Sequence, residues 1–249
     1  MSREVRVAVF RPADERLDGA VELLESLGAE PVPDPMLAVE PTSEVPESGA
    51  DYVILTSKTG VELAADAGWE PAADTTLVAI GPATAEVARE AGWTVDVVPA
   101  EYSSSGLVAA LRGAIEGATV EVARSDHGSD VLLDGLREAG ADVNETVLYE
   151  LVTPEESGES VDRAVAGELE AAAFTSSLTV ENFLDLAAER GVREEAIAGL
   201  NDAVVGVIGE PTRETAESHG IDVDVVPDEA TFDALGTTVV EAAAPTYHG

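Results

Sequence analysis

The chain contains one strand-turn-helix-strand pattern twice, and this duplication limits its fold more than any other feature. Residues 80–99 read IGPATAEVAREAGWTVDVVP, and residues 208–227 read IGEPTRETAESHGIDVDVVP. Eleven of the twenty paired positions are identical. Both copies place Gly and Thr where an apolar strand passes into an amphipathic helix. A separation of 128 residues is too long for a solenoid repeat and indicates a duplicated α/β unit.

Three further motifs recur in the two halves of the chain. TSKTGVE at residues 56–62 returns as TSSLTVE at residues 175–181. Residues 10–30 resemble residues 123–142 more loosely, and EYSSSGLVAAL resembles EATFDALGTTV near the C-terminus. Each half therefore contains an R-P or R-S turn, a T-S turn, an I-G…T turn and the start of a short final helix.

Short apolar runs alternate with amphipathic segments along the chain. The first helix is expected to place Leu17, Ala20, Val21, Leu24 and Leu27 on one apolar face and to end at Gly28. Near-continuous apolar strands between helices are typical of parallel sheets that are covered on both faces, so the predicted fold class is α/β. The expected strands are Val5–Phe10, Tyr52–Thr56, Leu77–Ile80, Val120–Ala123, Ala171–Thr175 and Val204–Ile208.

The order of the motifs favours a discontinuous first domain. Two segments without helical period, near residues 33–40 and 147–154, are interpreted as crossing linkers. We expect residues 1–36 and 154–249 to form domain 1 and residues 39–148 to form the inserted domain 2. The repeats are also compatible with two sequential domains that divide near residue 125.

The charge of the chain is extreme. Fifty acidic residues stand against thirteen basic ones, and the net charge is −37. Such a surface repels itself in dilute salt, whereas molar salt screens charges beyond about 3 Å. We interpret the composition as an adaptation to a high-salt cytoplasm, as in halophilic archaea. No basic patch is visible that could neutralise phosphates, which argues against nucleic acid and anionic lipid as partners.

The sequence contains no cysteine and no apolar run of transmembrane length. Without a secretory signal, the chain is expected to be cytoplasmic, and we expect it to be a monomer. It has no glycine-rich dinucleotide or P-loop motif, and its three histidines are too scattered to indicate a metal site.

Most candidate site residues follow directly after predicted strands. Ligands of open parallel sheets bind beyond the carboxyl ends of the strands, where helix N-termini also offer free N–H groups to anions. The alternative to ligand binding is a purely structural role, in which Ser and Thr cap the helices. The candidates for substrate binding are Arg11, Thr56, Ser57, Lys58, Gly81, Thr84, Tyr102, Ser103, Arg124, Ser125, Thr175, Ser176, Gly209 and Thr212.

Together these motifs resemble the uroporphyrinogen-III synthase family. The resemblance rests on F-R-P, T-S-x-x-x-V-E, I-G-P-x-T-A, P-x-x-Y-S-S-x-G-L, R-S-D and V-L-Y-E-L-V-T-P, which keep their order over almost the whole chain. It implies two flavodoxin-like domains with doubly wound parallel sheets, joined by a two-stranded linker, with an active-site cleft between them. It also implies a linear substrate, hydroxymethylbilane, with eight carboxylates, which loses water and closes to uroporphyrinogen III with its last ring inverted. The resemblance implies no metal and no organic cofactor.

The same resemblance singles out three side chains. Tyr149 matches the family's tyrosine on the return linker, where a phenol could hydrogen-bond the leaving hydroxyl as a weak general acid. Thr84 and Thr212 match the threonines of the I-G-x-x-T motif, although Glu210 stands where the family usually has Pro. The competing interpretation of the two-domain pattern is a non-catalytic, two-lobed protein that binds a small anion or regulates another process.

Overall fold

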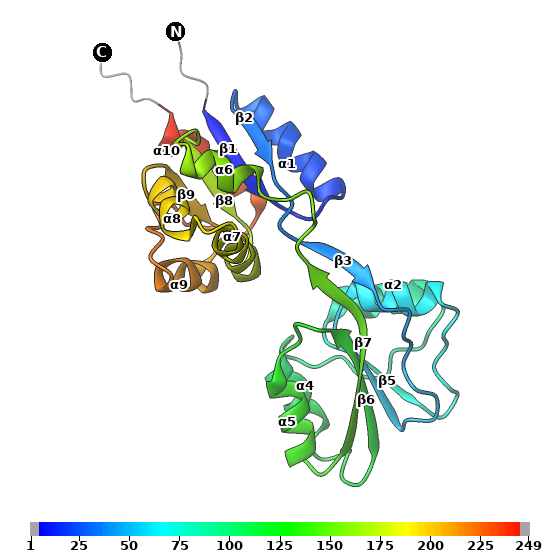
Figure 1. Cartoon of the computed structure of the whole chain (residues 1–249). Coiled ribbons are helices and arrows are strands. Elements are labelled where there is room, and N and C mark those ends of the chain that lie inside the picture. Colours follow the sequence, from blue (N-terminus) through cyan, green and yellow to red (C-terminus); the bar gives the residue numbers. More distant parts are fainter. Residues whose placement is uncertain (1–4, 245–249) are drawn as a thin grey trace. The chain divides into compact units, whose positions relative to one another are not determined.

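The chain folds into two compact units in the computed structural model, which describes residues 5–244. Unit 1 lies within Met1–Ala38 and Val152–Gly249, and unit 2 is Val39–Leu151. Unit 1 is therefore made from two separate stretches of chain, and unit 2 is inserted between them in the sequence. Figure 1 shows both units, coloured along the sequence.

The sheet of unit 1 has four strands in the order β2-β1-β8-β9. All three pairings are parallel, and Gly206 forms one further parallel bridge to Val225. Counted within the unit, the order is second, first, third, fourth, which is the flavodoxin-like doubly wound arrangement. The strands are β1 Arg6–Phe10, β2 Glu30–Pro33, β8 Ala171–Phe174 and β9 Val204–Val207.

Helices cover both faces of this sheet (Figure 1). Successive residues of β1 alternate between the faces: Val7 and Val9 pack with α1 (Glu15–Ser26) and α10 (Phe232–Ala243), whereas Ala8 and Phe10 pack on the opposite side. The helices of that opposite side are α6 Glu159–Val165, α7 Ser177–Glu189, α8 Arg193–Asn201 and α9 Glu210–Ser218. Burial on both faces explains why these strands contain almost only apolar residues.

Unit 2 repeats this plan with its strands permuted along the chain. Its sheet has the order β3-β7-β6-β4-β5, and Val78 bridges to Val97 at the position of a further strand. Relative to unit 1, β6 takes the place of β1 and β4 takes the place of β8. The strands are β3 Ala38–Pro41, β4 Tyr52–Leu55, β5 Thr76–Ala79, β6 Thr119–Ser125 and β7 Asp142–Val152.

The helices of unit 2 also lie on both faces of the sheet. Those that pack with Val53 and Leu55 on one face are α2 (Lys58–Asp66) and α3 (Pro82–Glu90). Those that pack with Ile54 and Val122 on the other are α4 (Ser104–Leu111) and α5 (Asp130–Glu138). Two sheets in which parallel pairings dominate, both covered on both faces, confirm the predicted α/β fold class.

The first helix illustrates how the sequence sets an element. Asp14 accepts a hydrogen bond from the backbone N–H of Arg16 and caps α1, and Ala20 and Leu24 are buried on its inner face. Gly28 adopts φ = 79°, a left-handed conformation that favours glycine and ends the helix. The predicted helix is confirmed, but the expectation for Leu27 is wrong: it is 37% exposed, because it is the C-cap residue beyond the last turn of α1.

The two segments interpreted as aperiodic linkers contain strands. The first of them runs into β3, residues 38–41, which is an edge strand of the sheet of unit 2. Residues 142–152 form β7, which pairs in parallel with β6 inside unit 2. Within residues 5–244, no helix is long and apolar enough to cross a membrane.

Candidate functional site

Five hydroxyl side chains cap helices at the carboxyl ends of the sheets, and one of them, Ser129, accepts from the N–H of Val131 at the start of α5. Ser57 and Ser103 accept hydrogen bonds from the N–H groups of Gly60 and Gly106, both at 3.0 Å. Ser176 and Thr231 cap α7 and α10 in unit 1 in the same way, from N–H groups three residues further on. These helix starts therefore have part of their free N–H groups satisfied within the chain.

The helices of the opening repeat differ, because they begin without a capping side chain. Gly81 precedes α3 and Gly209 precedes α9, with φ of −163° and −176°. These are extended conformations that any residue adopts, so the glycines are not required by the backbone. What they provide is a helix N-terminus without a side-chain hydrogen bond, with N–H groups left to receive an anion.

A buried threonine lies in the first turn of each of these two helices. Thr84 is 5% exposed and Thr212 is 4% exposed. Neither hydroxyl has a hydrogen-bond partner among residues 5–244. Among the described residues, the one fully buried side-chain oxygen without a partner is Glu121 Oε2, so both threonine hydroxyls remain accessible to water or to a ligand. The two I-G-x-x-T threonines thus have the burial and the free bonding capacity expected of ligand-binding groups.

A cavity of about 220 Å³ opens at the carboxyl ends of β4 and β6 in unit 2. This is the switch point of the sheet, where crossovers leave in opposite directions and ligands of doubly wound folds bind. Of the predicted residues, five line it together: Thr56, Ser57, Arg124, Ser125 and Tyr149. The lining also contains Ile80, Ser104, Gly128, Ser129 and Leu132, which the sequence patterns did not single out as site residues.

Tyr149 lies on β7, not on a free linker, and its side chain is almost fully buried. Its phenol donates a hydrogen bond to Ser57 Oγ at 3.0 Å, and the residue is 7% exposed. Arg124 pairs with Val147 and Ser125 pairs with Tyr149. Leu148 is therefore an extra residue on β7, a bulge that buries two consecutive side chains and turns Tyr149 toward the cavity.

Arg124 is buried at the cavity with two hydrogen bonds already made. Its Nε donates to Glu145 Oε1 at 2.5 Å and its Nη1 donates to the carbonyl of Ser129 at 2.7 Å. Its side chain is only 5% exposed. Sequence reasoning did not identify Glu145, because nothing in its neighbourhood marks it as the partner of a residue 21 positions earlier.

Arg11, the equivalent arginine of unit 1, differs from Arg124 in its hydrogen bonding. Arg11 follows β1, and its guanidinium lies 5.0 Å from the centre of the Phe232 ring. In the part of the chain that the structure describes, Arg11 makes no hydrogen bond or ion pair. Burial, and then the like charge of Arg16, lower the pKa of this guanidinium from its ordinary value. Arg11 therefore offers a half-buried cation whose donors are free.

The remaining predicted residues do not line the cavity. Lys58 is exposed at the first position of α2, and Tyr102 is 63% exposed with its ring next to Gly81. Thr175 donates to the carbonyl of Phe10 at 2.9 Å and so bridges the two strands at the switch point of unit 1. Arg11, Thr175, Ser176, Gly209 and Thr212 all belong to unit 1, and the other predicted residues belong to unit 2.

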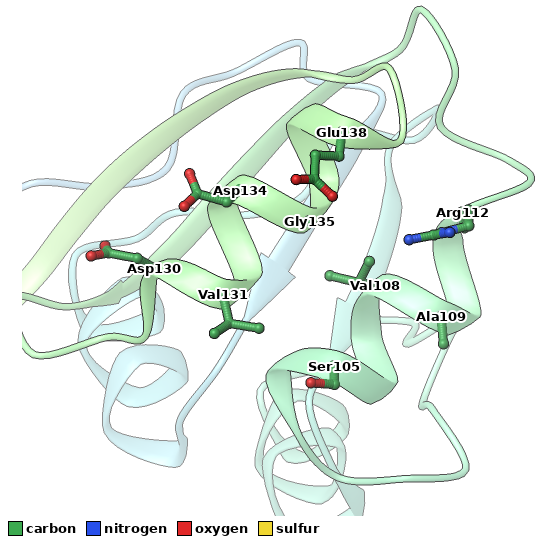
Figure 2. A pocket seen from close by; sticks show the side chains of 9 residues that line it. All are labelled: Ser105, Val108, Ala109, Arg112, Asp130, Val131, Asp134, Gly135 and Glu138. Atoms are coloured by element: carbon green, nitrogen blue, oxygen red, sulfur yellow. The ribbon is translucent and has the colours of Figure 1, made fainter.

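A larger cavity of about 700 Å³ lies between α4 and α5 (Figure 2). Val108 and Val131 belong to its lining, as do three acidic residues of α5, Asp130, Asp134 and Glu138. Arg112 is the basic residue of its lining. Three acids against one base disfavour an acidic ligand there, so electrostatics favour the smaller cavity as the candidate site.

Comparison with known proteins identifies the family. The family model of uroporphyrinogen-III synthase HemD matches residues 18–236. A putative uroporphyrinogen-III synthase from Methanothermobacter thermautotrophicus is 38% identical over 236 residues, which are 86% of this chain and 90% of that protein. Uroporphyrinogen-III synthase of Synechococcus elongatus is 28% identical and matches 79% of this chain and 76% of its own.

Solved structures share the fold. Uroporphyrinogen III synthase of Thermus thermophilus, as a triple mutant, aligns with a TM-score of 0.68 at 20% identity and covers 96% of this chain and 98% of its own. The enzyme of Helicobacter pylori aligns with a TM-score of 0.61 at 14% identity, with 96% and 100% covered. The family-model match over residues 18–236 and the 38% identity with the Methanothermobacter protein show that the chain belongs to the uroporphyrinogen-III synthase family.

Proposed function

We propose that the protein converts linear hydroxymethylbilane to uroporphyrinogen III, with inversion of the last pyrrole ring and loss of water. This is the reaction of a hydro-lyase that closes a ring. The observation that carries the proposal is the hydrogen-bonded pair of Tyr149 and Ser57 in the switch-point cavity of unit 2. This pair places a proton donor in the cavity where a doubly wound fold binds its ligand.

The donors at the strand ends suit a substrate with eight carboxylates. The N-termini of α3 and α9 have no side-chain cap, and Thr84 and Thr212 add hydroxyls without partners among the described residues. In unit 1, the free donors of Arg11 provide a cation for a carboxylate. Most of the binding in this proposal comes from backbone N–H groups, which a negatively charged chain can offer without a basic surface.

The chemistry requires a proton for the departing hydroxyl group. When the C–O bond of the hydroxymethyl group breaks, its electron pair leaves with the oxygen. The O–H of Ser57 gives this oxygen the proton that completes a water molecule, and the Tyr149 phenol passes its own proton to Ser57 Oγ. The carbon left behind becomes a cationic azafulvene, which the last pyrrole ring then attacks. Because Ser57 accepts the hydrogen bond of the phenol, its own O–H remains free to donate to the leaving oxygen.

A non-catalytic binding protein is the alternative, and membership of an enzyme family disfavours it. Incubation with hydroxymethylbilane that is made enzymatically in the same vessel separates the two. An active synthase yields the type III isomer, whereas a protein that only binds leaves the type I isomer that forms spontaneously. Type I alone, in molar KCl with the chain folded, would exclude the proposed reaction.

We also infer the setting in which the protein works. The charge of −37 and the single lysine support a monomer in a high-salt cytoplasm. Sedimentation in molar KCl tests the oligomeric state, since a dimer would double the 25.7 kDa mass. Loss of structure on dilution into low salt, followed by recovery in KCl, tests the adaptation to salt.

A further inference from the structure

The guanidinium of Arg124 has bonding capacity that the described part of the chain does not use. Arginine has five N–H groups, and two of those of Arg124 donate, to Glu145 and to the carbonyl of Ser129. The nearest other carboxylate, Asp130, lies 3.8 Å from Nη2, beyond hydrogen-bond distance, and its side chain is 90% exposed. Arg124 thus brings unsatisfied donors to the lining of the switch-point cavity.

The backbone around Arg124 leaves its side chain little freedom. Gly128 lies directly against it: a Cβ built on Gly128 would meet Arg124 Cδ at 2.3 Å and Nη1 at 2.5 Å. Real Cβ atoms do not approach so closely, so the turn after β6 fits the arginine only with glycine at this position. The carbonyl of Ser129 at the start of α5 then holds Nη1 from the same turn.

Glu145 fixes the opposite edge of the guanidinium. It lies on β7, in the strand beside β6, at the position that pairs with Val122. Its Oε1 accepts from Nε at 2.5 Å, and its side chain is 31% exposed. The three contacts come from β7 and from the turn after β6, and together they determine where the free N–H groups of Arg124 point.

We propose that Glu145 is a positioning residue, which holds Arg124 so that its Nη groups bind one carboxylate of the substrate. The proposal rests on the proposed function and adds a carboxylate subsite to the cavity of Tyr149 and Ser57. The competing role for Glu145 is neutralisation, in which its charge merely offsets that of Arg124. The two roles predict opposite results: loss of Glu145 weakens substrate binding if it positions Arg124, and strengthens it if it only neutralises.

The test compares Glu145→Ala and Glu145→Gln with the wild-type protein in molar KCl. Glu145→Ala is expected to raise KM for hydroxymethylbilane by roughly 10- to 100-fold, because Nε loses its acceptor and the guanidinium moves. The value of kcat is expected to change little, since a carboxylate away from the reacting carbon is bound equally before and during the reaction. Glu145→Gln keeps an oxygen acceptor and should restore most of the affinity. Glu150→Ala, on an exposed position of the same strand, is the matched control.

A second pair of variants moves Arg124 without changing any charge. Gly128→Ala forces the arginine aside while Glu145 stays, and KM is expected to rise as in Glu145→Ala. Gly113→Ala, whose Cβ meets no atom within 4 Å, is the control. Fluorescence of Trp69 and Trp93, both in the core of unit 2, reports whether each variant is folded. If Glu145→Ala does not fold, Gly128→Ala and Glu145→Gln still decide the question.

The positioning role of Glu145 and the proposed synthase function are tested by different results. An unchanged or lower KM in folded Glu145→Ala or Gly128→Ala overturns the positioning role, while type III product from the wild type leaves the proposed function intact. If the wild type makes only the type I isomer, calorimetric binding of uroporphyrinogen III to the same variants tests the subsite without turnover. Equal affinity of wild type and Glu145→Ala in that measurement would also overturn the inference.

Discussion

The phenol of Tyr149 and the hydroxyl oxygen of Ser57 are joined by a hydrogen bond of 3.0 Å. The same oxygen accepts from the N–H of Gly60 at 3.0 Å, which makes Ser57 the cap of α2. One serine therefore fixes the start of a helix and the direction of the phenol. The T-S motif therefore has a structural role, helix capping, and a proposed functional role, orientation of the phenol. Both roles use Ser57 Oγ.

Replacement of Tyr149 by Phe removes the proton donor and leaves the packing nearly unchanged. We expect Tyr149→Phe to lower kcat by roughly 10²–10⁴ if the phenol takes part in proton transfer. Initial rates of type III formation measure the effect. An unchanged kcat would exclude Tyr149 from the mechanism.

Ser57→Ala is the companion variant for a double-mutant cycle with Tyr149→Phe. If the two groups act as one unit, the double variant loses much less than the sum of the single losses in activation free energy. Ser57→Ala also removes a helix cap, at a cost of about 1 kcal/mol in stability. Thr231→Ala, which removes the cap of α10 in unit 1, is the control for that cost. Additive losses of activation free energy would show that the contact between Tyr149 and Ser57 does not contribute to catalysis.

Thr84 and Thr212 are expected to contribute less than Tyr149. Replacement of either threonine by Ala removes one hydroxyl, but the uncapped N–H groups of α3 and α9 survive the change. We therefore predict a fall in kcat/KM of roughly 10-fold or less for each variant, in line with one neutral hydrogen bond. A loss as large as that of Tyr149→Phe would contradict the view that backbone N–H groups do most of the binding.

The sequence predicted the central strands well because their burial on both faces leaves a continuous apolar run. Ala171–Thr175, for example, was expected as a strand and forms β8, Ala171–Phe174, with every residue buried. The strand β7 was missed for the opposite reason: Asn144, Glu145 and Glu150 interrupt any apolar pattern, and the strand is held by pairing with β6. A partner far away in the sequence leaves no local signal.

The candidate site was predictable only in part for the same reason. Strand-end positions of Thr56, Ser57 and Ser125 follow from the sequence, since the ends of buried strands and the starts of helices are both visible there. The turn of Tyr149 toward the cavity depends on the bulge at Leu148, which no residue type marks. The contact of Arg124 with Glu145 depends on the registry of two strands, which a single sequence does not contain.

The carboxylate of Asp34 caps a helix to which it is not adjacent in sequence. Its two oxygens accept from the N–H groups of Gly158 and Ser160, both at 2.8 Å, and Asp34 is 2% exposed. Because Asp34→Asn places an amide N–H against one of these donors, we expect it to destabilise unit 1 by about 1–3 kcal/mol. Thermal unfolding followed by far-UV circular dichroism measures this.

Asp228→Asn is the control for Asp34→Asn, because it removes the same charge from a position outside any helix cap. Tryptophan fluorescence does not suit this measurement, since Trp69 and Trp93 both lie in unit 2. Amide exchange at Ser160 provides a local readout, and faster exchange is expected there in Asp34→Asn. Equal stability of the two variants would show that the cap contributes nothing.

Glu121 is a fully buried carboxyl on β6, and its Oε2 has no hydrogen-bond partner within residues 5–244. Burial raises the pKa of this carboxyl, and the nearby charge of Glu47 adds to the rise, although the hydroxyl of Thr146 opposes it. The folded chain therefore holds this proton more tightly than the unfolded chain does. Stability from the neutral carboxyl is complete below the unfolded pKa and is lost as the pH rises through the folded pKa.

Glu121→Gln imitates the protonated form at every pH. We expect it to raise the free energy of unfolding by about 1–3 kcal/mol at alkaline pH, and the gain to vanish as the pH falls below the unfolded pKa. Denaturant unfolding followed by tryptophan fluorescence of unit 2 measures both limits. Glu90→Gln removes one exposed charge and controls for the general effect of acid on so negative a chain. A gain that does not depend on pH would show that burial of the charge is not its cause.

The last prediction follows from a conflict of charge between enzyme and substrate. The protein carries −37 and the proposed substrate carries eight carboxylates, so the long-range field slows their encounter at low ionic strength. Little basic charge is left to oppose this field. Many of the arginines lie in ion pairs, namely Arg6, Arg16, Arg124, Arg137, Arg163, Arg190 and Arg213.

Salt shortens the repulsion to a few ångströms and leaves the local contacts, such as Arg11 and the N-termini of α3 and α9, in place. We therefore expect kcat/KM to rise by about 10-fold or more from low salt toward molar KCl. An enzyme that attracts an anion with a basic surface shows the opposite trend. Because part of the rise could come from better folding, only salt concentrations with equal far-UV circular dichroism are compared. A steep fall of kcat/KM with salt, at constant fold, would mean that the site is far more basic than its residues indicate, and that backbone N–H groups are not the main ligands of the carboxylates.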